Sequence, residues 1–314
     1  MDLKQATDDF LMYLQVEKNY SKNTLKSYAF DLKLYASFLT KHDRSLNLDD
    51  LTAATTRRFI QEQVLEYQIK PRTLQRRISA LKSFCVYCIK ENYLKHNFML
   101  GVQAPKSDKK LPVYMTLQEL LKLFTYLENS TDRFATRNHV MFKLLATTGM
   151  RRQELVDLTW EQIDMYNQTI RIFGKGKKER LLPLHPILIP LLKEYIEQQE
   201  HYQLYPTEPV FLNKNKMKMD PRGLHKVFKD ILPKAGLPPK RYSLHHLRHT
   251  FATLLLQNKN NKVDIRILQE LLGHESLSTT AMYTHVNLEQ KKACNSFIYA
   301  VMKKRLGIFP KRLI

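Results

Sequence analysis

Apolar side chains recur every three or four residues along most of the chain, the spacing that places them on one face of a helix. In the N-terminal part this pattern predicts four helices, over residues 4–16, after Ser21, over about 55–67 and from Pro71 onward. Serine is a common helix N-cap, and proline is a common first residue of a helix. Four amphipathic helices of this size form a small bundle, so we expect a helical domain over residues 1–96.

The fourth of these helices divides most clearly into an apolar and a polar face. Its apolar positions are Leu74, Ile78, Leu81, Cys85 and Cys88. Cys85 and Cys88 have the spacing of zinc ligands, but both continue the apolar stripe, and the sequence offers no second pair of this kind. Buried core cysteines are therefore favoured over a zinc site.

The helical pattern lapses over residues 97–115, which contain a glycine, two prolines and several lysines. Such a composition is typical of a linker between domains. The pattern resumes at Thr116, which together with Glu119 has the sequence of a capping box. We therefore expect a second domain over residues 116–287, followed by an amphipathic helix and tail over residues 288–314.

One segment of the second domain has a different period. Residues 168–173 and 180–184 read as two short strands on either side of the polar turn 174–179. Two strands separated by such a turn predict a β-hairpin. The second domain is thus expected to be helical with a small β-hairpin, and the chain as a whole to be mainly α.

Basic residues exceed acidic residues by a wide margin. The 314 residues include 51 Lys and Arg against 30 Asp and Glu, a net charge of +21. An excess of this size favours a polyanionic partner, nucleic acid before an anionic membrane, because solubility rarely needs so much charge. No secretory signal or membrane-length apolar run is visible, and three cysteines are too few for a disulfide framework. These features indicate a soluble cytoplasmic protein with nucleic acid as its favoured partner.

The strongest candidate chemistry lies in the C-terminal part of the chain. Ser243 is a plausible N-cap, which places His245 in the first turn of a helix and Arg248 on the same face. A helix start offers free N–H groups and the positive end of the helix dipole, both suited to a phosphate. His274 follows, and Tyr283 lies nine residues beyond it. Cations gathered around a tyrosine suggest phosphoryl transfer to that tyrosine.

Two segments upstream supply further charge. One is Thr-Gly-Met-Arg-Arg-Gln-Glu-Leu, which contains Arg151 and Glu154, and the other is Gly-Lys-Gly, which contains Lys175. With these segments the sequence resembles the tyrosine recombinase (phage integrase) family, in its Xer-like two-domain branch. The pattern of that family is T-G-x-R-x-x-E-L, a hairpin lysine, H-x-x-R, a G-H pair and a tyrosine. Every element is present here in the same order, and the resemblance covers most of the chain.

The resemblance implies a fold and a reaction. The fold is an N-terminal four-helix core-binding (SAM-like) domain followed by an α+β catalytic domain. The reaction is site-specific cleavage and rejoining of DNA strands through a 3′-phosphotyrosine, without metal, ATP or any other cofactor. The implied catalytic residues are Arg151, Lys175, His245, Arg248, His274 and Tyr283. Among them the arginines and histidines surround the phosphate, Lys175 protonates the leaving oxygen and Tyr283 attacks, while Glu154 orients the first arginine.

The resemblance and the net charge also make several basic side chains candidates for DNA contact, with solvated helix faces as the alternative. These are Lys22, Lys26, Arg57, Arg58, Arg72, Arg76, Lys177 and Lys178, and the pair Arg76-Arg77 is included for the same reason. The expected partner is double-stranded DNA with paired inverted half-sites. The expected assembly is a homo-oligomer on that DNA, a tetrameric synapse. The need for an accessory protein stays open, and so does docking of the segment 288–314 in cis or in trans.

Other functions share some of these residues or their spacing. A type IB topoisomerase shares this chemistry, and a non-catalytic DNA-binding regulator shares the fold. The spacing of His245 and His249 matches a zinc-protease helix, but His246 stands where that motif needs a glutamate. The turn around Lys175 lacks the upstream glycine and the Ser or Thr of a nucleotide-binding loop. A site-specific recombinase is the favoured hypothesis.

Overall fold

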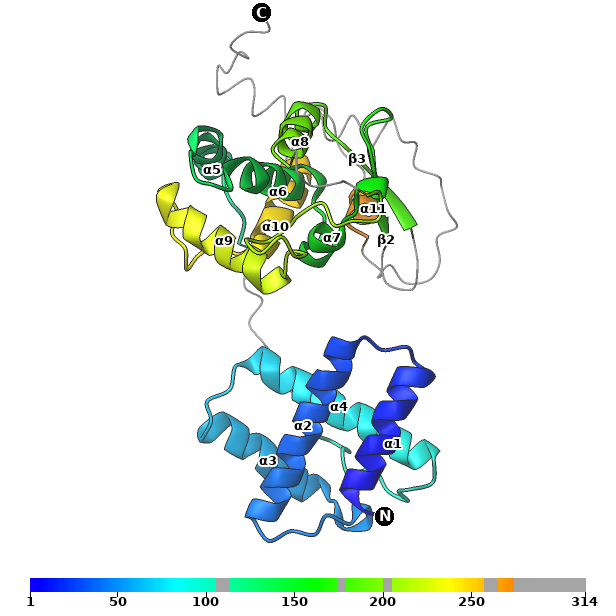
Figure 1. The fold of residues 1–314 in the computed structure, drawn as a ribbon. Coiled ribbons are helices and arrows are strands. Elements are labelled where there is room, and N and C mark those ends of the chain that lie inside the picture. The colour runs from blue at the N-terminus through cyan, green and yellow to red at the C-terminus, as the bar shows by residue number, and fades with distance from the viewer. Residues whose placement is uncertain (106–112, 174–178, 200–204, 257–264, 274–314) are drawn as a thin grey trace, which may run out of the picture. The chain divides into compact units, whose positions relative to one another are not determined.

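The computed structural model describes residues 1–105, 113–173, 179–199, 205–256 and 265–273 (Figure 1). The chain divides into two compact units, Met1–Lys110 and Leu111–Ile314. Both units are built mainly from helices, so the expected mainly α fold with a small sheet is confirmed. The amphipathic helix expected after residue 287 lies outside the described residues.

Unit 1 contains the four helices that the sequence predicts. They are α1 (Leu3–Val16), α2 (Lys22–Lys41), α3 (Ala53–Leu65) and α4 (Pro71–Lys90), with the 3-10 turn η1 (Leu48–Asp50) between α2 and α3. The Ser21 side chain accepts a hydrogen bond from the Thr24 N–H, and Pro71 is the first residue of α4, as expected. Helix α3 begins earlier than its apolar pattern suggests, because the Thr52 side chain caps it by accepting from the Thr55 N–H.

The core of unit 1 is rich in aromatic rings. Phe10 packs edge-on against Phe84, and Tyr35 packs edge-on against Phe59. Cys85 and Cys88 are fully buried in the same core, and burial raises the pKa of the Cys88 thiol to about 12. These positions confirm that the two cysteines are core residues.

The segment between the two units is packed at both ends. Phe98 and Val102 are buried in the core of unit 1, and Met115 is buried in the core of unit 2. The Met115 N–H donates to Thr250 Oγ1 at 2.8 Å. The buried residues of this segment are not spaced at the regular intervals of a helix or a strand, so a search for periodic apolar positions does not find them. Unit 1 therefore continues past residue 96, where the sequence pattern placed the start of the linker.

Unit 2 is organised around one buried helix. Its elements are α5 (Leu117–Asn129), α6 (Ala135–Thr148), α7 (Arg152–Asp157), η2 (Trp160–Gln162), β1 (Ile163–Asp164), β2 (Thr169–Phe173), β3 (Glu179–Pro183), α8 (Leu188–Glu197), α9 (Pro221–Lys234), α10 (Leu244–Leu256) and α11 (Ile265–Leu272). Helix α6 packs against α5, α8 and α10, and all its residues from Arg137 to Thr148 are buried (Figure 1). Thr116 caps α5 through the expected capping box with Glu119.

The sheet of unit 2 is antiparallel, in the order β1-β2-β3. Strands β2 and β3 are the expected hairpin, with Phe173 opposite Glu179 and Ile172 opposite Arg180. Strand β1 was not predicted because two residues are too short to show a period of two. The register places Arg180 beside Ile172, which is buried, and thus on the inner face of the hairpin.

Candidate active site

The turn after α6 brings the first motif into place. Gly149 adopts the left-handed conformation, with φ of 63°, and its N–H donates to the Leu145 carbonyl at 3.1 Å. A Cβ atom at this position would lie 2.5 Å from Cδ1 of Phe251, on α10. Only glycine fits such a turn at so close an approach. The chain therefore reverses tightly here, and Arg151 follows immediately beside α10.

Arg248 lies on α10, one turn after His245, and its side chain is only 5% exposed. Its Nη1 donates to the Gly149 carbonyl at 2.8 Å, and its Nη2 donates to the Leu272 carbonyl. Burial, together with the nearby charge of Arg151, lowers the pKa of Arg248 to about 10. The guanidinium is still charged at neutral pH, so it is a fixed cation in a largely dry setting.

Arg151 precedes α7 and is held by Glu154 in the first turn of that helix. The Arg151 N–H donates to Glu154 Oε2 at 2.6 Å, and Arg151 Nη1 donates to Glu154 Oε1 at 2.8 Å. Its Nη2 donates to the Gly273 carbonyl. The Arg151 side chain remains 42% exposed, so Glu154 and the Gly273 carbonyl hold one side of it while the other side is open to solvent.

Arg180, at the start of β3, is a member of this network that the motif pattern did not identify. Its Nη1 and Nη2 donate to Glu154 Oε1 and Oε2 at 2.9 and 2.7 Å, and its Nε donates to the Leu271 carbonyl at 3.2 Å. Burial by itself would raise the pKa of Glu154, but the hydrogen bonds and charges of Arg180 and Arg151 outweigh it and lower that pKa. Glu154 is therefore an ionised carboxylate shared by two arginines.

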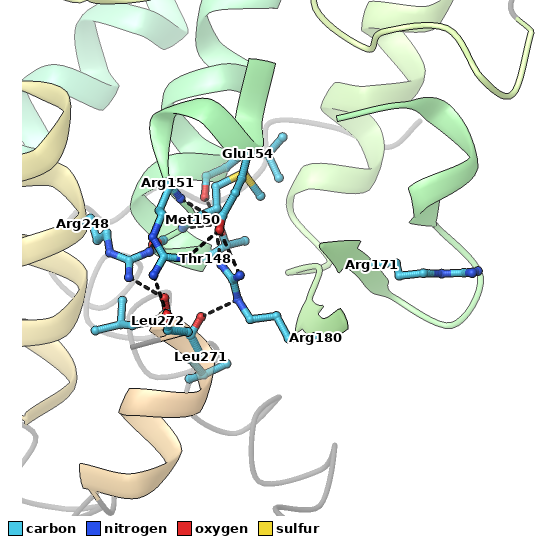
Figure 2. A network of polar contacts seen from close by, with 12 residues as sticks. Thr148, Met150, Arg151, Glu154, Arg171, Arg180, Arg248, Leu271 and Leu272 are labelled. Atoms are coloured by element: carbon cyan, nitrogen blue, oxygen red, sulfur yellow. Dashed lines mark hydrogen bonds and ion pairs between the residues drawn. The ribbon is translucent and has the colours of Figure 1, made fainter. Parts of the chain in front are cut away.

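Three arginines converge on the C-terminal end of α11 (Figure 2). The carbonyls of Leu271, Leu272 and Gly273 accept hydrogen bonds, in that order, from Arg180, Arg248 and Arg151. A helix C-terminus carries unpaired carbonyls and the negative end of the dipole, so cations stabilise it. Gly273 has φ of 60°, and a Cβ atom there would lie 3.1 Å from Arg180 Nη1. The glycine of the Gly-His pair thus lets the arginines approach.

Helix α10 also places three histidines near Arg248. His245 lies in its first turn, as expected, and is exposed. The rings of His245 and His249 meet nearly perpendicularly, with centroids 4.4 Å apart. Burial and the charge of Arg248 lower the pKa of His249. The Ser243 N–H donates to His246 Nδ1 at 3.1 Å, so that side chain caps the start of the helix.

Comparison with known proteins identifies the family. Residues 113–290 match the phage integrase family, and residues 7–92 match the phage integrase N-terminal SAM-like domain. The chain is 35% identical over 302 residues to "Tyrosine recombinase XerD" of Staphylococcus aureus, covering 94% of this chain and 99% of the relative. The chain belongs to the tyrosine recombinase (phage integrase) family. Another XerD, of Oceanobacillus iheyensis, is 33% identical over 92% of this chain and 96% of its own length.

Solved structures of the family have the same fold. The XerH recombinase bound to its difH substrate, in a pre-cleavage complex, matches with a TM-score of 0.67 at 26% identity, over 92% of this chain and 84% of that one. A lambda integrase dimer bound to a COC′ core site matches with a TM-score of 0.66 at 19% identity, over 91% of this chain and 100% of that one. The second likeness supports the fold alone.

Within this family framework, the structure brings Arg151 and Glu154 into contact and holds Arg151 and Arg248 on the successive carbonyls of Gly273 and Leu272. His245 lies on the same helix as Arg248. The other expected catalytic residues, Lys175, His274 and Tyr283, lie outside the described residues, as do Lys177 and Lys178. In the parts of the chain that the structure describes, no group of His, Cys, Asp or Glu is arranged to hold a metal ion. The described helices also include none that is long and apolar enough to cross a membrane.

The candidates for DNA contact in unit 1 fall into two groups. Exposed side chains are found at Lys22, Lys26, Arg57, Arg58 and Arg72. Arg76 is half-buried instead, and its Nη1 donates to Asp31 Oδ2 and to the Ser27 carbonyl.

The expectation that Arg77 lies on a solvated or DNA-facing surface is wrong. Its side chain is buried, donates to Gln63 Oε1 and lies 3.4 Å from Asp31 Oδ1. Helix α4 turns this position toward α2 and α3, where the buried Asp31 carboxylate compensates the charge. A run of charges in the sequence did not reveal that one of its members has an internal partner.

Proposed function

We propose that this protein is a site-specific recombinase that breaks and rejoins DNA strands through a 3′-phosphotyrosine on Tyr283. Membership of the family supports the recombinase activity, and the arginine network supports the chemistry. The observation that carries the proposal is the convergence of Arg151 and Arg248 on the carbonyls of Gly273 and Leu272. Two guanidinium groups from distant motifs are thereby fixed next to the residue that precedes His274.

The proposed reaction is a transesterification at phosphorus. The Tyr283 hydroxyl releases its proton to solvent, helped by the surrounding cations, and its oxygen forms a bond to the phosphorus. The bond from phosphorus to the 5′-oxygen breaks, and Lys175 gives that oxygen its proton. Arg151 and Arg248 hold the non-bridging oxygens of the transition state, with His245 and His274 as further donors. Preorganised charge of this kind is usually the largest single catalytic contribution. Because the phosphotyrosine preserves the energy of the phosphodiester bond, rejoining needs no ATP.

The proposed substrate is duplex DNA with paired inverted half-sites, and the proposed assembly is a tetramer on that DNA. The relatives support the DNA partner, since XerH was solved bound to its difH substrate. The net charge of +21 agrees with a polyanionic partner. A cytoplasmic, DNA-associated location is part of the same proposal.

The experiment starts by selecting a recognition site from random duplex DNA through repeated rounds of binding. A nicked duplex of that site then traps the cleaved state, and covalent complex is measured on a denaturing gel, in EDTA and without nucleotide. The wild type should form the complex, whereas Tyr283→Phe should bind the site and form none. Tyr166→Phe, at an exposed tyrosine of unit 2, is the matched control and should behave as the wild type.

Two results would contradict the proposal. Covalent complex formed by Tyr283→Phe would exclude this tyrosine as the nucleophile, and strict dependence on added metal or nucleotide would exclude the mechanism. Relaxation of any supercoiled plasmid, without need of a defined site, would indicate a type IB topoisomerase. Site binding without cleavage by the wild type would indicate a non-catalytic regulator.

A further inference from the structure

Arg180 has no role in the chemistry proposed above, yet its side chain donates three hydrogen bonds within the site, against two each from the side chains of Arg151 and Arg248. Its side chain is 11% exposed, and that of Glu154 is 8% exposed. Both terminal nitrogens of Arg180 bond the carboxylate of Glu154, and its Nε bonds the Leu271 carbonyl. Such a paired, fork-like contact fixes the plane of the carboxylate as well as its position.

The carboxylate that Arg180 fixes is the one that orients Arg151. Glu154 Oε1 accepts from Arg180 Nη1 at 2.9 Å and from Arg151 Nη1 at 2.8 Å. The Arg151 side chain is much more exposed, so few other contacts restrict its rotamers. Rotation of the carboxylate would therefore move the guanidinium of Arg151, and the two bonds from Arg180, together with the bond from the Arg151 N–H, oppose this rotation.

A second path runs from Arg180 to α11. Its Nε bond to Leu271 lies next to the bonds by which Arg248 and Arg151 hold the following two carbonyls. Arg180 is also within 3.1 Å of the place where a Cβ of Gly273 would be. Strand β3 is thereby joined to the end of the helix that both catalytic arginines contact.

We propose that Arg180 is a positioning residue for DNA strand cleavage, acting through Glu154 on the guanidinium of Arg151. It does so from behind the site, without touching the phosphate. This inference rests on the proposed function. Its alternative is that Arg180 only stabilises the fold, in which case its replacement would change stability and leave the cleavage rate of folded protein unaltered.

The decisive variant is Arg180→Lys, which keeps the charge and removes the fork. A single ammonium group cannot reproduce three directed bonds to Glu154 and Leu271. We expect site binding within about twofold of the wild type and single-turnover cleavage slowed by about 10²-fold, since misplacement of a catalytic group by about 1 Å has that effect. Arg171→Lys is the matched control, because Arg171 lies on β2, is exposed and points away from the network (Figure 2).

A double-variant comparison tests whether Arg180 acts through Arg151. Cleavage is measured on DNA with a sulfur at the 5′-bridging position, a leaving group that needs no protonation, so that slow variants stay measurable. If Arg180 acts through Arg151, then Arg151→Ala combined with Arg180→Lys should cleave as fast as Arg151→Ala alone. If the double variant is instead slowed by the product of the two single-variant losses in cleavage rate, the inference is overturned. Restoration of Arg180→Lys to the wild-type rate by the sulfur substrate would also overturn it, since its role would then concern the general acid.

Thermal unfolding separates positioning from folding. If Arg180→Lys does not fold, Glu154→Gln breaks the same contact with a side chain of nearly the same shape. A folded Glu154→Gln protein should cleave slowly and without further loss in the Arg151→Ala background, and cleavage at the wild-type rate would overturn the inference. If the wild-type protein cleaves DNA and folded Arg180→Lys cleaves at the same rate, this inference is refuted and the proposed function stands. Failure of the wild type to form a tyrosine adduct would refute the proposed function itself, and this inference with it.

Discussion

Arg248 donates a hydrogen bond from Nη1 to the carbonyl oxygen of Gly149 at 2.8 Å, across 99 residues of sequence. The bond joins the end of α6 to α10 and connects two motifs that the sequence shows only as separate patterns. Because Arg248 is buried, this carbonyl supplies one of the partners that its charge requires. The glycine of the first motif is thus part of the site that holds the second arginine.

Gly149→Ala should destabilise unit 2 by about 2–4 kcal/mol. The estimate combines a left-handed backbone, at roughly 1–2 kcal/mol, with overpacking against Phe251. Gly236→Ala is the matched control, because Gly236 has φ of +70° and open space where a Cβ would be. That variant should show only the backbone contribution, about 1–2 kcal/mol. Chemical denaturation measures both, and equal losses would show that the contact with Phe251 does not matter.

Glu154→Gln should lower stability at neutral pH by about 3 kcal/mol, because it leaves the largely buried Arg180 without its counter-charge. The pKa of Glu154 is lowered in the folded protein from its ordinary value of 4.5. Its ionised form therefore contributes stability above that value, and the contribution is lost as the pH falls through the lowered pKa. The stability difference between wild type and variant should be constant from pH 7 to about 4.5 and shrink below. A difference that does not vary down to the acid-unfolding range would contradict this assignment.

The sequence predicts the elements of this fold well where the periodic pattern extends over many residues. Helix α4 shows why, since its apolar stripe at Leu74, Ile78 and Leu81 is buried as its spacing requires. Capping residues such as Ser21 and Thr116 act within a few residues of chain, so their partners can be identified from the sequence. The two-residue strand β1 has no such local signal, and it forms only because β2 lies beside it.

The site is predictable to the extent that its residues carry a known motif. The buried positions of Arg180 and Arg77 could not be predicted, because the partner of each side chain is distant in the sequence. Position 180 reads as an ordinary charged residue at the start of a strand. The one available signal is the hairpin register, which sets Arg180 opposite the apolar Ile172 and predicts a buried charge once the turn is placed. Such a charge needs a carboxylate, and Glu154 is the acid of the neighbouring motif.

Lys175→Ala should slow cleavage of normal DNA by about 10²–10⁴-fold, the usual contribution of a general acid. A substrate with a 5′-bridging sulfur should restore most of the rate, because a thiolate leaves without a proton. Lys177→Ala and Lys178→Ala are the matched controls, as they remove the same charge two and three residues further along the chain. If only Lys177→Ala or only Lys178→Ala is slow on normal DNA and is restored by the sulfur substrate, that lysine is the general acid. If the sulfur substrate restores Arg151→Ala and not Lys175→Ala, the assigned roles are reversed.

Arg72 and Arg76 lie on the same helix, but their replacement should have opposite consequences. Arg72 is exposed, and Arg72→Ala should weaken DNA binding, reduce the slope of log affinity against log salt by about 1 and leave stability unchanged. Arg76 instead donates to the fully buried carboxylate of Asp31. Arg76→Ala should therefore destabilise unit 1 by about 1–3 kcal/mol, since it removes a partner from a buried charged group.

The comparison is made by measuring thermal unfolding and DNA binding at several salt concentrations for both variants. Burial raises the pKa of Asp31 despite the neighbouring arginines, so this carboxylate depends on the partners that remain. Arg77 stays within 3.4 Å of it when Arg76 is removed, which limits the loss and keeps the variant folded enough to test. A folded Arg76→Ala protein with an unaltered salt slope assigns Arg76 to the core of unit 1. A slope reduced as much as in Arg72→Ala, with stability unchanged, would instead make Arg76 a phosphate contact that is only lightly held by Asp31.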